Sequence, residues 1–112
     1  MTRSDIETSA AVLVTTATAD EHAAEQIAAA LLDRRLAACV QILPVRSRYR
    51  WKNVVETAEE WRLEIKTMRD RVPAIATLLD RLHPYELPEL LVLPVLDGSA
   101  AFLAWIDENA SG

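Results

Sequence analysis

Apolar residues along this chain follow two different spacings, and the spacing changes several times. Residues 11–16 (AVLVTT) form a short, β-branched apolar run, which predicts a strand buried on both faces. Apolar positions then recur every three or four residues as far as Leu36, which predicts a helix. Thr18, followed three residues later by Glu21, matches a capping box at the start of that helix.

The middle of the chain has a period of two. A second apolar run at residues 38–43 is followed by Pro44, and residues 45–51 and 55–67 then alternate between two faces. With Asn53 at the apex of a turn, Arg50 would face Glu56 and Arg46 would face Glu60. This arrangement predicts a long hairpin. Its projecting aromatic side chains, Tyr49, Trp51 and Trp61, favour a partner surface such as a second copy of the chain.

Helical spacing returns in the last third. Residues 72–82 predict a second helix that ends at His83-Pro84, residues 90–95 (LLVLPV) predict a strand buried on both faces, and residues 101–108 predict a final helix. The predicted fold is therefore α+β: a ferredoxin-like βαββαβ sandwich with a long hairpin between its second and third strands and an extra C-terminal helix. We expect one domain over residues 11–109, after a polar tail at residues 1–10.

The amino-acid composition excludes several classes of function. The 112 residues suit a single soluble domain, and the net charge of −5 argues against nucleic acid as a partner. Two glycines are too few for a phosphate-binding loop or a dinucleotide fingerprint, so no organic cofactor is indicated. The single cysteine, with no readable signal peptide and no apolar run of membrane-spanning length, favours a cytoplasmic protein that does not enter a membrane.

Candidate chemistry concentrates in the loop at residues 83–89 (HPYELPE). Its imidazole, phenol and carboxylates could form a metal or small-ligand site, or the loop could simply end a helix. Cys39 could be a soft copper ligand or a small buried apolar residue. The arginines at positions 46, 48 and 50 could bind an anion or pair with glutamates across the hairpin. No catalytic motif is present, so we expect no enzyme; a hydrolase would need His83 and Glu89 in one pocket.

Several segments in this order together resemble one family. They are residues 36–40 (LAACV), the motif Pro44-x-x-Ser47-x-Tyr49-x-Trp51, Glu59-Glu60 before residues 65–67 (IKT), the 83–89 loop, and residues 93–95 (LPV) followed by Phe102-Leu103-x-Trp105. The chain resembles the CutA divalent-cation tolerance proteins over about residues 12–107. The resemblance implies a homotrimer, a link to copper and other divalent cations, and a likeness to the trimeric PII signalling proteins.

Position by position, the resemblance implies His83 and Cys39 as metal-ligand candidates. It implies Trp51, Lys66, Tyr85 and Glu86 as candidates for a cleft between subunits. Thr16 and Leu82 stand where some members have a cysteine and a second histidine. Two functions are therefore expected: a trimeric protein that binds divalent metal ions, and alternatively a PII-like trimer that binds a small molecule or a protein partner without catalysis.

Overall fold

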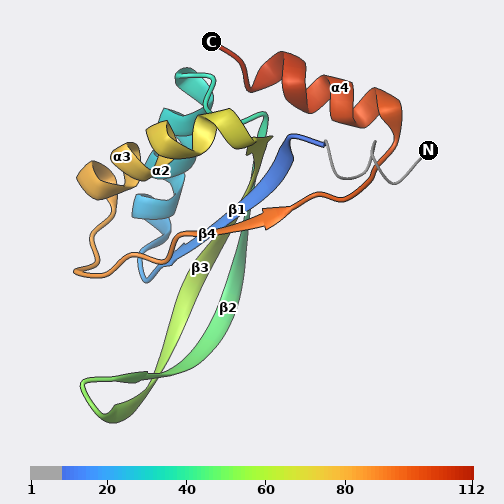
Figure 1. Cartoon of the computed structure of the whole chain (residues 1–112). Coiled ribbons are helices and arrows are strands. Elements are labelled where there is room, and N and C mark those ends of the chain that lie inside the picture. The colour runs from blue at the N-terminus through green and yellow to red at the C-terminus, as the bar shows by residue number, and fades with distance from the viewer. Residues whose placement is uncertain (1–8) are drawn as a thin grey trace.

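The computed structural model describes residues 9–112 and shows one antiparallel sheet with the strand order β2-β3-β1-β4 (Figure 1). Along the chain the elements are β1 (Ala11–Thr18), α2 (Glu21–Asp33), β2 (Cys39–Trp51), β3 (Val54–Met68), a 3-10 turn (Arg69–Arg71), α3 (Val72–Leu82), β4 (Leu91–Pro94) and α4 (Ala100–Asn109). The predicted ferredoxin-like sandwich, its long hairpin and its C-terminal helix are confirmed. Within the described residues, no helix is long and apolar enough to cross a membrane.

The hydrophobic core lies between the sheet and the helices α2 and α3. Alternate residues of β1 and β3 point into it and meet the apolar stripes of both helices. Its largest fully buried aliphatic side chains are Val12, Val14, Ile27, Leu31, Leu63, Ile65 and Ile75. The remaining residues of these strands point to the opposite side of the sheet, here called the second face, which includes Thr15, Glu60, Arg62, Glu64 and Lys66.

Thr16 lies fully buried on the core side of β1, and its hydroxyl has no hydrogen-bond partner within the described part of the chain. An unpaired buried hydroxyl is destabilising. We therefore expect Thr16→Val to raise the free energy of unfolding by about 1 kcal/mol in urea denaturation. Thr67→Val is the matched control, because the Thr67 hydroxyl donates to the Leu36 carbonyl at 2.6 Å. It should lower stability, and equal effects of the two substitutions would contradict the prediction.

The ends of α2 differ from the sequence prediction. Thr18 is the last residue of β1, and the N-cap is Asp20, whose Oδ1 accepts from the His22 amide at 3.0 Å. The helix ends at Asp33, short of Leu36, because Arg35 adopts a left-handed conformation with a φ of 56°. The Arg35 guanidinium donates to the carbonyls of Glu108 and Ser111, which ties α4 to the end of α2.

The hairpin turn also differs from the prediction. Lys52 and Asn53 together form a two-residue turn with φ values of 50° and 67°. Left-handed conformations at both positions match the twist of the flanking strands. The pairing therefore shifts by one residue: Arg50 lies opposite Val55 and Arg46 opposite Glu59. The predicted pairs Arg50–Glu56 and Arg46–Glu60 are wrong.

The last strand is shorter and more exposed than predicted. All four residues of β4 are exposed, so the prediction of a strand buried on both faces is wrong. Within residues 9–112 the strand lies at the edge of the sheet and pairs only with β1. Trp61 was expected to project with Tyr49 and Trp51, but it packs against the core.

Candidate functional site

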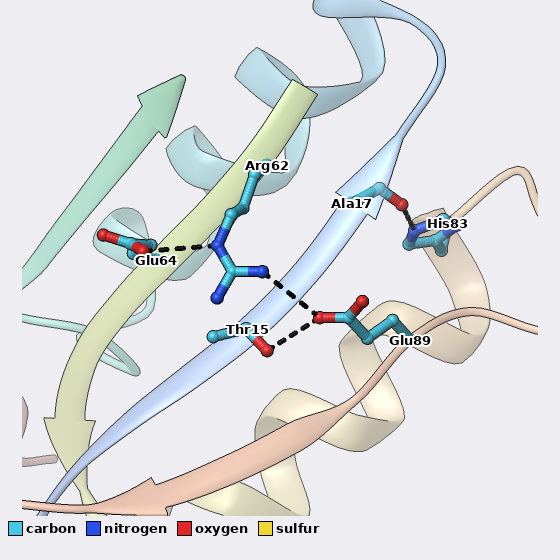
Figure 2. A network of polar contacts seen from close by, with 6 residues as sticks. All are labelled: Thr15, Ala17, Arg62, Glu64, His83 and Glu89. Carbon is cyan, nitrogen blue, oxygen red and sulfur yellow. Dashed lines mark hydrogen bonds and ion pairs between the residues drawn. The ribbon is translucent and has the colours of Figure 1, made fainter. Parts of the chain in front are cut away.

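The 83–89 loop begins with a buried histidine whose ring is held on both sides. His83 follows α3 and turns away from helical geometry, while its amide donates to the Leu79 carbonyl at 2.8 Å. Its Nε2 lies 2.8 Å from the Ala17 carbonyl of β1 (Figure 2), and its Nδ1 accepts from the Tyr85 amide at 3.1 Å. A carbonyl only accepts and an amide only donates, so His83 is the Nε2–H tautomer.

The charge state of His83 follows from its surroundings. Burial lowers the pKa of His83, while the Ala17 carbonyl and the Glu60 carboxylate raise it by smaller amounts. The imidazole is therefore neutral at pH 7. Both ring nitrogens are occupied by backbone groups, so a metal ion could bind His83 only after one of these hydrogen bonds had broken.

Tyr85 connects the loop to the second face of the sheet. Its hydroxyl donates to Glu60 Oε2 at 2.7 Å, and its ring centroid lies 4.9 Å from that of His83. Burial, and then the hydrogen bond to Glu60, raises the pKa of Tyr85 far above its usual value. The phenol therefore keeps its proton and remains a donor to Glu60, which is buried on β3.

Glu89 makes the second connection between loop and sheet. Its Oε2 accepts from the Thr15 hydroxyl at 2.7 Å and lies 3.9 Å from Arg62 Nη1 (Figure 2). Arg62 Nε in turn donates to Glu64 Oε2 at 3.2 Å. Glu89 thus fixes one end of the loop to β1 by a hydrogen bond and to β3 by an ion pair, and His83 and Tyr85 fix the other end.

A pocket of about 730 Å³ lies between the loop and the projecting hairpin. Its size is within the range of small-molecule sites. The lining includes three of the predicted cleft residues, Trp51, Tyr85 and Glu86. It also includes three side chains that were not predicted as cleft residues: Tyr49, Glu60 and Glu89. The alternation of β2 places Tyr49 on the face of Trp51, and that signal could have found it.

The other candidates lie elsewhere. Lys66 pairs with Cys39 near the far end of the sheet, and its Nζ lies 5.7 Å from the centroid of the Phe102 ring. Cys39 is partly buried at the start of β2. The pocket of the single chain is not lined by Lys66, Cys39 or His83. A hydrolase site would need His83 and Glu89 together in one pocket, and this pocket contains only Glu89. Residues 9–112 contain no group of three His, Cys, Asp or Glu side chains that could hold a metal ion.

The fold and the site can be compared with known proteins. The family model for the CutA1 divalent ion tolerance protein matches residues 12–109. The chain belongs to the CutA1 family. The divalent-cation tolerance protein CutA of Yersinia pestis (strain Pestoides F) is 42% identical over 102 residues, which are 90% of this chain and 84% of that protein.

Solved CutA structures have the same fold. CutA from Xylella fastidiosa superposes with a TM-score of 0.88 at 40% identity, covering 92% of this chain and 100% of that one. CutA1 from the psychrotrophic bacterium Shewanella sp. SIB1 gives 0.87 at 38% identity, covering 92% and 97%. The CutA1 family is thus one of divalent-cation tolerance proteins, and this chain has the fold of its solved members.

Proposed function

We propose that this CutA1-family protein is a cytoplasmic homotrimer that binds copper or another divalent cation and catalyses no reaction. Membership of a divalent-cation tolerance family is the observation that carries the proposal. The lone thiol, Cys39, suits a reducing compartment. The trimer and the metal site are each supported by further features of the chain.

An exposed apolar surface supports self-association. It combines edge strand β4 and the segment after it with exposed aromatic side chains of α4. Its members are Leu91, Val92, Leu93, Leu96, Phe102 and Trp105, with exposures between 40% and 63%. Among the described strands β4 has no neighbour on its outer edge, which adds backbone donors and acceptors to this surface. Closed symmetry would bury such a surface in every copy at once.

A metal site shared between subunits would explain why the potential ligands of one chain are not grouped together. Residues 9–112 hold no three-donor cluster, so the proposed site takes ligands from more than one copy. A threefold axis supplies three copies of any ligand near it, so one histidine or one thiol per chain is enough. Cys39 and His83 are the proposed ligands, and His83 must give up one hydrogen bond to act.

Copper titration of the tag-free protein, with its mass in solution measured alongside, tests this proposal. We expect a mass three times that of the chain and calorimetric saturation at a fixed copper(II) ratio per trimer. Leu93→Arg places a charge in the β4 surface and should yield a folded monomer without saturable copper binding. Leu32→Arg is the matched control, since Leu32 is similarly exposed on α2. A monomeric native protein, or copper binding that survives in the monomer, would overturn the proposal.

A second candidate function is a PII-like trimer that binds a small molecule or a protein partner. The pocket of about 730 Å³ beside the loop favours it, because its lining is preformed by hydrogen bonds to the sheet. Titrations with a metal ion and with a small molecule distinguish the two functions. Metal binding that is lost in Cys39→Ser or His83→Gln supports the first, and loss of small-molecule binding in pocket variants supports the second.

A further inference from the structure

We propose that one side of the projecting hairpin binds an acidic protein segment in extended conformation, through the arginines at positions 46, 48 and 50. These arginines occupy alternate positions of β2, so they share one side of the hairpin, here called the arginine face. Their sequence pattern is compatible with two roles, anion binding and pairing with glutamates across the hairpin. The observed register favours anion binding.

The register leaves two of the three arginines without an acidic neighbour across the hairpin. Arg50 lies opposite Val55, and Arg48 lies opposite Thr57. Only Arg46 has a glutamate opposite it on β3. Within residues 9–112, the arginines that form ion pairs belong to β3 and to the 3-10 turn, not to β2. All three residues of the arginine face are exposed, so their charges are available to a ligand.

The arginine face lies on the opposite side of the hairpin from the pocket. Tyr49 and Trp51 point to the second face, whereas the arginines point to the side on which Leu63 faces the core. The hairpin extends well past α2 and α3, and these helices do not cover its far half (Figure 1). The apolar surface proposed for self-association lies on β4, the segment after it and α4. The arginine face is therefore separate from the pocket and from that surface.

The spacing of the arginines fits an extended acidic segment. Alternate residues of a strand are about 6.8 Å apart, and alternate side chains of any extended peptide repeat at the same distance. A segment with a carboxylate at every second position can therefore place one carboxylate on each guanidinium, whose planar fork matches it. One exposed ion pair contributes little to affinity, so a small anion that contacts a single arginine would bind weakly.

The charge of the whole chain favours a protein segment over a nucleic acid. The chain has a net charge of −5, so phosphates that extend beyond the three arginines would meet a repelling surface. A nucleic acid carries a charge at every nucleotide. A protein segment can carry carboxylates only where the arginines lie and be neutral elsewhere.

Fluorescence anisotropy with two labelled peptides tests the inference on the native protein. One peptide alternates glutamate with threonine, and the other has the same composition with its glutamates in one block. We expect the alternating peptide to saturate at low salt with a dissociation constant below about 1 mM, and to bind at least about threefold more tightly than the block peptide. Equal binding of the two peptides, equally tight binding of single-stranded oligothymidylate, or no saturation in the millimolar range would overturn the inference.

Substitution of the central arginine tests the site itself. Arg48→Gln should weaken binding of the alternating peptide about threefold. The matched control is Arg81→Gln, which removes the same charge from an exposed position of α3 and should leave the affinity unchanged. Equal effects of the two substitutions would contradict the proposed site.

The mass of each variant in solution, measured alongside, distinguishes a peptide site from a contact between copies. We expect Arg48→Gln to keep the mass of the native protein. A lower mass would assign the arginine face to a contact between copies and would overturn the inference. No metal ion is present in these titrations, so a negative result leaves the metal proposal standing.

Discussion

Replacing Leu63 by alanine should lower the free energy of unfolding by about 3 kcal/mol. Leu63 is fully buried in the middle of β3, where it pairs with Thr16 of β1 and with Ile42 of β2. Truncation removes apolar contacts and leaves a cavity that the surrounding sheet and helices cannot close. Urea denaturation at a fixed protein concentration would measure the loss.

The control for this truncation is Leu32→Ala, which makes the same chemical change at an exposed position of α2. Its effect should stay within about 0.5 kcal/mol. A similar loss in both variants would show that leucine truncation destabilises the protein regardless of burial. That result would contradict the assignment of Leu63 to the centre of the core.

Replacing His83 by alanine should lower the free energy of unfolding by about 2–3 kcal/mol. The substitution leaves the Ala17 carbonyl without its donor and the Tyr85 amide without its acceptor, and it empties a buried ring site. His83→Gln should be milder, because its side-chain amide can still donate to Ala17. A loss equal to that of alanine would contradict the hydrogen-bonding role assigned to Nε2.

His83 also makes stability depend on pH. Burial lowers the pKa of the folded-state imidazole below its ordinary value of 6.5, so between these two pKa values the unfolded chain binds more protons. The contribution of neutral His83 is complete above pH 6.5 and is lost as the pH falls through the folded-state pKa. Native protein should therefore lose more stability than His83→Gln between pH 7.5 and 5.

The sequence predicted which residues share a strand face more reliably than which residues pair. Alternation is a local property, and it placed Leu63 and Ile65 together on one side of β3, which is the side that faces the core in the structure. Register depends on the turn, where Lys52 and Asn53 both take left-handed conformations, and a change of one residue moves Arg46 from Glu60 to Glu59. A lysine in that conformation carries little sequence signal, because glycine, asparagine and aspartate are its usual occupants.

The candidate site was predictable only in part, because its contacts join distant segments. The loop residues Tyr85 and Glu86 were found from their dense chemistry, and they do line the pocket. The residues of the sheet that bind the loop were not predicted from the sequence. Tyr85 donates a hydrogen bond to Glu60, 25 positions away, and Glu89 accepts one from Thr15, 74 positions away. A single sequence contains no local pattern that reports such pairs.

Edge strand β4 shows a different limit. An apolar run of four to six residues has the same pattern whether it is covered by helices of its own chain or remains on the surface. Leu91 and Leu93 read as core residues but are 57% and 43% exposed in the chain. The pattern of apolar residues indicates that a surface must be covered, but it does not indicate whether the same chain or another molecule covers it.

The central position of β1 has a consequence for the order in which the sheet assembles. The β2–β3 hairpin closes through a two-residue turn, so its pairs can form on a timescale of microseconds. β1 instead pairs with β3 and β4, which lie dozens of residues downstream, and each pairing requires closure of a long loop. During synthesis the ribosome releases β1 before either neighbour exists. We expect β1 to lack at least one of its two neighbouring strands until nearly the whole chain has emerged. This strand is therefore the segment most in need of protection while the protein is being made.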